Sequence, residues 1–358
     1  MRRILITGCG GYAAIGFIRC LQQAKEKFYL VGADSNIYNT FFRLTDKTYL
    51  LPSGDDPSYI GALNKIIKKE KIEMIWSQPP QEVKTISENR EKILAKVFLP
   101  SKETVDIFES KIETAKCLKE KGVAIPQSLL VESKKDLRKA FKLFGKKIWL
   151  RAIKGAGGKG AFLASNLLEA LFWMEFNKGW GSFSAAEYLS GKGFGCDMLF
   201  YEGKLVFSQV KERISYFMSK VNIVGVTGTT GVLKTVNDPR INEFCEKAVY
   251  AIDAKPHGVF DVDMKCDLNG NPKVTEINIG RFLSSSLSLF YKTGFLAPYY
   301  CIKLALEGKL PVKIKKINPI PADIIVVRQL DIEPQSFLEK DVKRIEEIRQ
   351  KNLVALIK

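Results

Sequence analysis

Histidine is almost absent from this chain, and its cysteines do not form metal-binding pairs. Among 358 residues there is one histidine, His257, and the seven cysteines include no CxxC motif. A histidine-rich metal centre, a zinc knuckle and a Cys–His nucleophile therefore lack the residues that they need. Scattered cysteines in an odd number also argue against a disulfide framework. We interpret His257 as a structural residue.

Long apolar runs are absent as well. No stretch approaches the roughly 20 apolar residues that cross a bilayer. The segment MRRILITG is broken at Gly8 and no small-residue cleavage site follows, so we expect no signal peptide. A hydrophobic fraction of 46% indicates a globular rather than a disordered chain. We expect a cytoplasmic protein of two or three domains.

The positive charge is not gathered into one block. The net charge is +17, but the lysines and arginines are spread along the chain, and no helix-turn-helix, RNP or zinc-finger pattern accompanies them. We therefore do not expect nucleic acid as the partner. The charge is consistent with an anionic substrate, and a solvated lysine-rich surface stays open as the alternative.

Over residues 1–100 the sequence alternates between strand and helix patterns. Strands are expected at 3–8, 28–34 and 72–78, and an amphipathic helix at 56–71. This alternation predicts a parallel, doubly wound sheet. Gln78 ends the third strand, where ligands of such sheets bind, so it is a candidate substrate residue; a purely structural role is equally open.

Beyond Pro100 the pattern becomes mixed. Two short helices are followed by a helix with Ser133 as N-cap and Gly145 as C-cap. Two antiparallel hairpins are expected, one turned at Glu202-Gly203 and one at Asn269-Gly270. The remaining expected elements are strands at 147–153, 161–164, 183–189 and 320–332 and helices at 166–177, 239–253 and 336–354.

The first glycine motif, GCGGYAAIG, joins the first strand to a helix, and Asp34 ends the next strand. Glycines allow a tight turn there, and the amides at the helix start attract phosphate, so the motif is compatible with dinucleotide binding. The match to GxGxxG is incomplete because Ala13 occupies the last glycine position. The same turn can serve packing alone, and this alternative stays open.

The second glycine motif, KGAGGKG, occupies residues 154–160 between two expected strands. It is not a Walker loop, which requires GK[ST] at the start of a helix. Its amides and Lys159 could close over phosphates, and Arg151 on the preceding strand could grip one of them. A simple glycine-rich hairpin tip is the alternative.

Two carboxylates and an amide are expected on one face of the second hairpin. Counting from the Asn269-Gly270 turn, Asp263 and Glu276 lie level on neighbouring strands, and Asn278 follows on the same face. Oxygen ligands of this kind suit Mg²⁺ beside nucleotide phosphates. An acidic hairpin exposed to water is the alternative.

Together these segments resemble the ATP-grasp superfamily of carboxylate–amine ligases, especially the branch of the carbamoyl-phosphate synthetase large subunit. The resemblance covers about residues 1–310. It is carried, in order, by GCGGYAAIG, SKIETAKCLKEKGVAIP, WLRAIKGAGGKG, AEYLSGKG and DVDMKCDLNGNPKVTEIN. It implies an α/β plus α+β chain, with a Rossmann-like pre-ATP-grasp domain (1–100), lobe A with the lid (101–190), lobe B with the metal site (191–315) and a C-terminal strand and helix (316–358).

The resemblance also implies roles for individual residues. Arg151 and Arg281 would be catalytic, and Gln78, Arg281 and Ser284 would face the substrate. Asp263, Glu276 and Asn278 would hold Mg²⁺ or Mn²⁺. ATP would be bound by Lys111, Arg151, Gly155, Gly157, Gly158, Lys159, Gly160, Glu187, Tyr188 and Leu189.

The chain departs from the family pattern in two places. An acid that commonly grips the ribose two residues after the hinge glycine is missing, since Gly191 is followed by Lys192 and Gly193. The usual Asn-Pro-Arg is replaced by Asn278-Ile279-Gly280-Arg281, which shifts the arginine by one position. Neither change removes an expected metal ligand.

The expected function is an ADP-forming ligase that activates a carboxylate as an acyl phosphate and joins it to an amine or another nucleophile. Its partners would be small-molecule carboxylate and amine substrates, anionic or bound to a carrier, and a homodimer is compatible with the superfamily. An ATP-binding regulatory protein of the same fold is the alternative. An NAD(P)-dependent enzyme that uses the first glycine motif and Asp34 is a further alternative.

Overall fold

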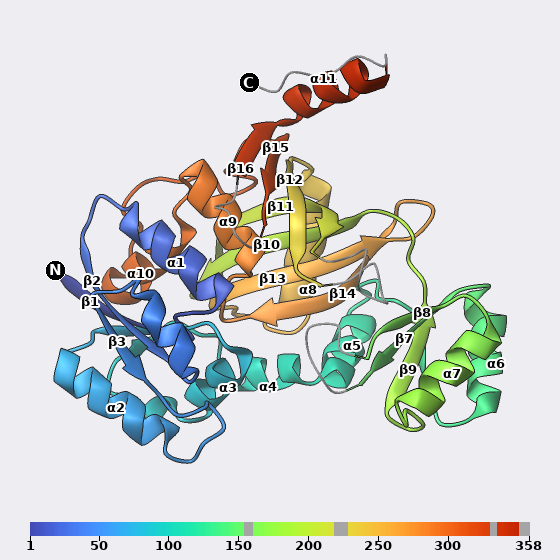
Figure 1. Ribbon diagram of the computed structural model, residues 1–358, viewed down its shortest axis with the longest axis horizontal. Helices are drawn as coiled ribbons and strands as arrows, with labels where there is room; N and C mark the ends of the chain where they lie inside the picture. Colours follow the sequence, from blue (N-terminus) through green and yellow to red (C-terminus); the bar gives the residue numbers. More distant parts are fainter. Residues whose placement is uncertain (154–159, 218–227, 330–334, 351–358) are drawn as a thin grey trace.

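The computed structural model of the chain describes residues 1–153, 160–217, 228–329 and 335–350. Figure 1 shows an N-terminal domain, a central body built on a large sheet, and a small lobe on the far side of that body. The last helix, α11 (Glu339–Gln350), projects from the body. Among the described helices none is both long and apolar enough to cross a membrane.

The N-terminal domain is built on a five-stranded parallel sheet of order β3-β2-β1-β4-β5. The central strands β1, β2 and β4 are largely buried, which explains why β1 reads as a continuous apolar run, whereas the edge strand β3 is partly exposed. Helix α1 covers one face, and α2 and α3 cover the other. The elements are β1 (Arg2–Thr7), α1 (Tyr12–Gln22), β2 (Phe28–Asp34), η1 (Ile37–Phe42), β3 (Lys47–Leu50), α2 (Tyr59–Glu70), β4 (Met74–Ser77), α3 (Pro80–Glu88), η2 (Arg90–Lys92) and β5 (Lys96–Val97).

The small lobe has a four-stranded antiparallel sheet of order β6-β9-β7-β8, packed against two helices. The helix α6 begins at the expected Ser133, where Ser133 and Asp136 form a capping box, and ends at Gly145 with φ +93°. The elements are β6 (Ser128–Val131), α6 (Lys134–Phe144), β7 (Ile148–Ala152), β8 (Phe162–Ala164), α7 (Leu167–Phe176) and β9 (Phe183–Glu187).

The central body contains a seven-stranded antiparallel sheet of order β14-β13-β10-β11-β12-β15-β16. Both expected hairpins are present, and the Glu202-Gly203 turn has positive φ at both residues. The strands are β10 (Gly193–Tyr201), β11 (Lys204–Tyr216), β12 (Thr230–Val236), β13 (Gly258–Cys266), β14 (Pro272–Ile279), β15 (Ile324–Val327) and β16 (Gln335–Leu338).

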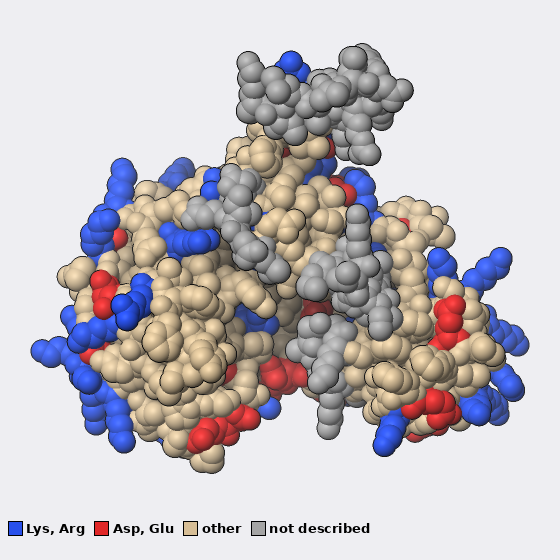
Figure 2. All heavy atoms as spheres, in the orientation of Figure 1, with Lys and Arg blue, Asp and Glu red and all other residues tan. Residues whose placement is uncertain are grey.

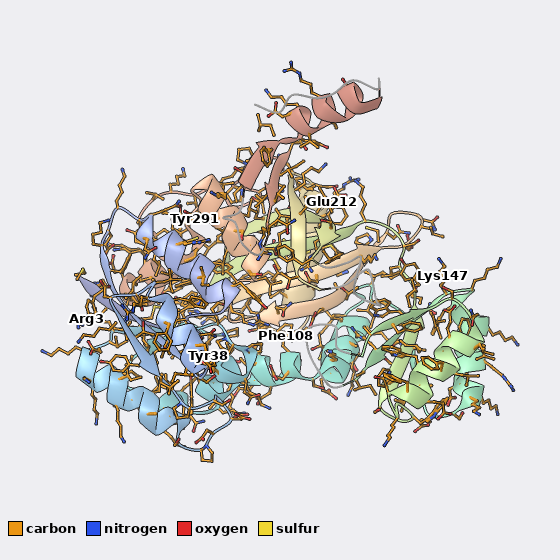
Figure 3. All side chains as sticks on the ribbon, viewed as in Figure 1. Arg3, Tyr38, Phe108, Lys147, Glu212 and Tyr291 are labelled. Atoms are coloured by element: carbon orange, nitrogen blue, oxygen red, sulfur yellow. The ribbon has the colours of Figure 1, made fainter. Side chains whose placement is uncertain are left out.

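Helices cover both faces of this central sheet. Helix α8 (Pro239–Tyr250) packs on one face, and α4 (Lys102–Glu109) joins it there through Phe108, labelled in Figure 3, whose ring meets Phe260 edge-on at 5.9 Å. Helix α9 (Ser284–Thr293) and helix α10 (Ala297–Glu307) lie on the opposite face. Helix α5 (Lys111–Glu120) follows α4 toward the small lobe.

Helix α9 also packs against the N-terminal domain. Gly16 of α1 lies so close to Leu287 that an added Cβ would come within 2.8 Å of the Leu287 Cβ. Tyr291, labelled in Figure 3, has the guanidinium of Arg19 5.8 Å from its ring centroid. One apolar core therefore runs from the parallel sheet through α9 into the central sheet.

The alternation of strands and helices and the mixed α/β class agree with the sequence prediction. The C-terminal region differs from it in one respect, because residues 335–338 form strand β16 rather than the start of a helix. The reason is that β15 would otherwise have an edge of unpaired backbone groups. Strand β16 pairs with this edge in antiparallel orientation, with Ile325 opposite Phe337. Residues 351–354 of the expected helix lie outside the described residues.

A buried carboxyl group lies at the carboxyl ends of the parallel strands. Glu82 is 4% exposed, and its Oε2 accepts hydrogen bonds from the Tyr59 hydroxyl (3.0 Å) and the Ser77 hydroxyl (3.4 Å). Thr7 extends this network by donating to Ser77 (2.9 Å). Burial raises the pKa of Glu82 despite these donors. The space at these strand ends is thus filled by protein groups.

Replacing Glu82 should therefore change how stability depends on pH. Because the pKa of Glu82 is raised in the folded state, the protonated carboxyl contributes to the free energy of unfolding at pH values below its ordinary pKa of 4.5. That contribution is lost as the pH rises through the pKa of the folded state. We expect Glu82→Gln to be stabilised relative to the wild type at pH 8 more than at pH 4.5. Denaturant unfolding at the two pH values measures this difference. The exposed Glu88→Gln on the same helix is the control, and an equal effect at both pH values would contradict the assignment.

Candidate active site

The two expected carboxylates face each other across the second hairpin. Asp263 of β13 is directly opposite Glu276 of β14, and the next pair is Asp261 opposite Asn278. A bulge follows, since Met264 is opposite Val274 and Thr275 is left over. The register predicted from the Asn269-Gly270 turn is thus present, and it brings three of the candidate ligands onto one face of the sheet.

A glycine on β10 gives a lysine of β11 room to cross the same face. Gly195 lies between Asp263 on one side and Lys211 on the other. A Cβ on Gly195 would come within 3.1 Å of the Lys211 Cε and 3.3 Å of an Asp263 carboxylate oxygen. Gly195 therefore leaves Lys211 a path over β10 from β11 to β13. Gly193 lies opposite Arg213 in the same register.

Lys211 is fully buried at the centre of this face. Its ammonium donates to Asp197 (2.6 Å), to Asp261 (2.6 Å) and to the hydroxyl of Ser286 on α9 (2.9 Å). Burial disfavours the charged ammonium, but the two carboxylates outweigh it and raise the pKa of Lys211. Lys211 thus joins strands β10, β11 and β13 to helix α9.

The two aspartates beside Lys211 have different environments. Burial, together with the neighbouring Asp261 charge, raises the pKa of Asp197 to about 7. Lys211 and Arg213 overcome the burial of Asp261 and hold its pKa well below the usual range. Asp197 Oδ1 and Asp261 Oδ1 are both buried without a hydrogen-bond partner among the described residues.

Arg213 continues the charged row. Its NH2 donates to Asp263 Oδ1 in a close ion pair, and the same NH2 lies 3.9 Å from Asp261 Oδ1. Burial raises the pKa of Asp263 in spite of this ion pair. Arg213, Lys211, Asp197 and Asp261 were not among the candidates from the sequence. The sequence does contain an indication of this site, because Gly193, Gly195 and Asp197 occupy alternate positions of one strand. Interpreting it requires knowing the register of that strand against its neighbours.

Lys111 and Arg151 come from two other parts of the chain and lie within electrostatic range of Glu276. Lys111 begins α5 and Arg151 lies on β7 of the small lobe. Burial lowers the pKa of Arg151, and burial together with the Arg151 charge lowers that of Lys111, while Glu276 acts in the opposite direction on both. The structure therefore brings the proposed phosphate-binding cations close to the proposed metal ligand.

Arg281 lies at the end of β14 and donates from NH2 to Asn278 Oδ1 (3.1 Å). Burial lowers the pKa of Arg281, and Glu276 is the strongest of the acids that oppose this. The inserted Gly280 has φ +69°, and a Cβ there would come within 2.7 Å of Leu99. The shifted arginine thus still reaches the charged face. Ser284 starts α9, and its carbonyl accepts from the Ser288 hydroxyl (3.0 Å).

The expected adenine hinge lies at the end of β9. The Glu187 carboxylate accepts from Lys273 (2.6 Å) and from the Gln127 amide (2.7 Å), and the Glu187 amide donates to the Gln127 carbonyl (3.0 Å). Tyr188 has the Lys265 ammonium 5.3 Å from its ring centroid, and Leu189 is buried. Adenine binding by these three hinge residues stays a prediction.

The expected lid lies largely outside the described residues. Gly155, Gly157, Gly158 and Lys159 belong to the segment 154–159, which the structure does not describe. Gly160 is described, has φ +76°, and its carbonyl accepts from the Trp173 indole (3.1 Å). The lid role of this loop also stays a prediction.

Gln78 is held by protein groups. It is 5% exposed, and with its amide oriented to satisfy both neighbours it accepts from Trp76 Nε1 (3.1 Å) and donates to the Phe282 carbonyl (3.2 Å). These contacts favour the structural alternative for Gln78. They link β4 of the N-terminal domain to the segment that precedes α9.

The first glycine turn is closed by its own chain. The Gly10 amide donates to Asp34 Oδ2 (3.0 Å), and the Asn39 side-chain amide donates to the same oxygen (3.2 Å). A Cβ on Gly10 would come within 2.3 Å of the Asn39 Cβ. Asp34 and the space over the turn are therefore engaged by η1, and this favours a packing turn over a dinucleotide site.

Comparison with known proteins places this geometry in a fold. Residues 4–98 match the family described as PylC-like, N-terminal domain. A sequence comparison with curated proteins gives no match. Among solved structures, an L-amino acid ligase from Bacillus licheniformis superposes with a TM-score of 0.67 at 12% identity, over 91% of this chain and 79% of the other.

Two further structures have the same arrangement. The biotin carboxylase domain of 2-oxoglutarate carboxylase from Hydrogenobacter thermophilus, in complex with MgADP, ADP and bicarbonate, gives a TM-score of 0.69 at 15% identity over 91% and 74% of the two chains. N5-carboxyaminoimidazole synthetase from Staphylococcus aureus with ADP gives 0.66 at 17% over 98% and 86%. This chain has the ATP-grasp fold. The fold expected from the sequence resemblance is confirmed.

The donor set on this ATP-grasp sheet fits a divalent cation. Asp263, Glu276 and Asn278 offer hard oxygen ligands side by side, and the unpartnered Asp261 Oδ1 is close by. No three histidine, cysteine or acidic side chains within the described ranges form a metal site by themselves. The set therefore needs water or phosphate oxygens to complete it, which is the way Mg²⁺ is commonly bound.

Removing the central cation should destabilise the ATP-grasp body. Lys211→Met leaves two fully buried aspartates without their shared cation, and we expect a loss of about 3–5 kcal/mol in the free energy of unfolding. Guanidinium unfolding monitored by fluorescence measures it. The control is Lys204→Met, an exposed lysine at the start of the same strand. A loss below about 1 kcal/mol would show that the aspartates find other partners.

Proposed function

We propose that this chain is an ADP-forming ligase that activates a carboxylate as an acyl phosphate and joins it to an amine. The observation that carries the proposal is the convergence on Glu276 of the facing Asp263 with two cations, Lys111 and Arg151, from separate parts of the chain. Each was expected at this site from the sequence. Facing carboxylates beside buried cations are what a triphosphate and its metal ions require.

The proposed roles follow from position and charge. Lys111 and Arg151 bind phosphate oxygens, and burial of both strengthens their attraction for an anion. Arg281, held by Asn278, points its charge toward the same face and orients the carboxylate that receives the phosphoryl group. Asp263, Glu276 and Asn278 hold Mg²⁺ or Mn²⁺, which would offset the charge that develops on the transferred phosphoryl group.

The comparisons support the reaction class and suggest where to look for substrates. Their names include an L-amino acid ligase and enzymes crystallised with ADP or with MgADP and bicarbonate. We therefore propose small-molecule carboxylates, with amino acids tested first, and amines as acceptors. On the face that Figure 2 shows, the positive side chains are spread around the outer edges and do not fill one patch, so this face does not favour nucleic acid. The homodimer and the cytoplasmic location stay predictions.

Two observations favour the second candidate, an ATP-binding regulatory protein. Asp263 is engaged by Arg213, and the position of the ribose-binding acid is a glycine, Gly193. Both features weaken binding of a metal-nucleotide complex without changing the fold. The two candidates differ in whether Mg-ATP is turned over.

Trapping the activated carboxylate distinguishes the candidates. The chain is incubated with Mg-ATP and hydroxylamine across pools of amino acids, dicarboxylates and sugar acids, and ADP and hydroxamate are measured. A ligase gives both products with at least one pool, and subdividing that pool identifies the donor. Measurable Mg-ATP binding without ADP or hydroxamate from any pool would support the regulator.

With a substrate in hand, Glu276→Gln should abolish the activity. The substitution keeps the shape of the side chain but removes the charge that faces Asp263, and we expect kcat to fall on the order of 10²-fold or more. Steady-state ADP release measures this, with the exposed Glu243→Gln as the control. Activity within a few-fold of the wild type would remove Glu276 from the metal site.

A further inference from the structure

Arg213 occupies the carboxylate that a metal ion would need. Its guanidinium is ion-paired with Asp263 Oδ1, and the two side chains are only 13% and 14% exposed. A divalent cation and this guanidinium compete for the negative charge of the same carboxylate. Metal binding at Asp263 therefore requires Arg213 to leave or share its partner.

An acceptor for the displaced guanidinium already lies beside it. Asp261 Oδ1 is 3.9 Å from the same Arg213 nitrogen and is buried without a hydrogen-bond partner among the described residues. Arg213 Nε is also buried and unpartnered in that part of the chain. A buried carboxylate oxygen without a hydrogen-bond donor lowers the stability of the fold. Asp261 Oδ1 and the Arg213 guanidinium could therefore form a stabilising hydrogen bond that the present arrangement does not contain.

Lys211 cannot supply the missing donor. An ammonium has three N–H groups, and those of Lys211 are used by Asp197 Oδ2, Asp261 Oδ2 and Ser286. Asp261 is thereby fixed through one oxygen while its other oxygen faces Arg213. A proton on Asp197 is the other group that could satisfy this oxygen, since Asp197 Oδ1 is unpartnered as well.

We propose that Arg213 is a built-in countercation for the metal site. It neutralises Asp263 while the site holds no metal and passes to Asp261 Oδ1 when a divalent cation binds. The inference rests on the proposed function, because it takes Asp263 as a metal ligand. Arg213 is then a positioning residue. Its displacement from Asp263 lowers the affinity for the metal ion, and its new ion pair with Asp261 recovers part of that affinity.

The test measures binding of Mn²⁺ alone to the full chain, by the electron paramagnetic resonance signal of the free ion. Arg213→Met removes the competing cation, so we expect Mn²⁺ to bind about tenfold more tightly than to the wild type. The matched control is Arg240→Met, which removes the arginine of an exposed ion pair with Asp238. Unchanged or weaker binding to Arg213→Met overturns the proposal.

A double-mutant cycle tests the second half of the inference. Asp261→Asn keeps an oxygen for Lys211 but removes the negative acceptor for Arg213, so Mn²⁺ should bind several-fold more weakly than to the wild type. In the Arg213→Met background the same change should have little effect. Equal weakening in both backgrounds means that Asp261 acts on the metal directly or through its proton, and it overturns the transfer to Asp261.

Two further measurements keep the test decisive. If Arg213→Met is too unstable to isolate, Arg213→Gln, which can still donate to Asp263 without a charge, takes its place, and its melting temperature should rise more on adding Mn²⁺ than that of the wild type. Glu276→Gln reports on the metal site itself. If Glu276→Gln weakens Mn²⁺ binding but the Arg213 variants do not strengthen it, the role of Arg213 alone is overturned. If no variant binds Mn²⁺ even with ADP present, the metal site is overturned and the proposed function with it.

Discussion

The charged half of the central sheet depends on the burial of one ammonium group. Lys211 has no exposed surface, yet it is the shared partner of Asp197 and Asp261 and contacts α9 through Ser286. Without it, two carboxylates would lie beneath a helix without their shared cation, at a cost of about 3–5 kcal/mol, which is a large part of the stability of an ordinary domain. The same face continues as an apolar core, in which Leu199, Phe207 and Val259 pack against α9 and the N-terminal domain. One strand face thus changes from apolar to ionic along its length, and the candidate site residues lie at the ionic end.

The sequence around β10 departs from the pattern that the resemblance implies, and the structure explains part of the departure. An acid is expected at Gly193, and Gly195 follows on the same face. A Cβ on Gly195 would lie 3.1 Å from the Lys211 Cε, so bulk at this position would press on the buried ammonium group. A Cβ on Gly193 would make only ordinary contacts, with the Tyr216 hydroxyl at 3.5 Å and the Met264 carbonyl at 3.9 Å. The buried cation therefore accounts for the glycine at position 195 but not for the missing acid at position 193.

Local patterns in the sequence were enough for much of the fold and for half of the site. The Asn269-Gly270 turn and period-two alternation fix which residues face each other, so Asp263 and Glu276 could be paired without a structure. Helix α6 was readable from its caps. In contrast, the packing of α9 against α1 joins Gly16 to Leu287, and no local period connects residues so far apart. The pairing of Lys211 with Asp197 was hidden for a related reason, since it needs the register of β10 against β11 before the alternation can be interpreted. For Gln78 the rule about strand ends left a substrate role and a structural role equally open, and only the contacts with Trp76 and Phe282 favour the structural one.

Positive and negative side chains nearly balance in the candidate site. Five cations, Lys111, Arg151, Lys211, Arg213 and Arg281, lie with four acids, Asp197, Asp261, Asp263 and Glu276, so the face is close to neutral before any ligand is bound. A metal ion that arrives alone adds positive charge and must also take Asp263 from Arg213. Phosphate oxygens that bind without a metal ion are attracted by the cations but repelled by the carboxylates of Glu276 and Asp263. The metal ion offsets the charge of these carboxylates, and the phosphate offsets the charge of the cations, so each ligand reduces the repulsion that opposes binding of the other. We expect metal and triphosphate to be favoured as a pair, and the crowding of opposite charges around one face of the sheet is the physical source of that coupling.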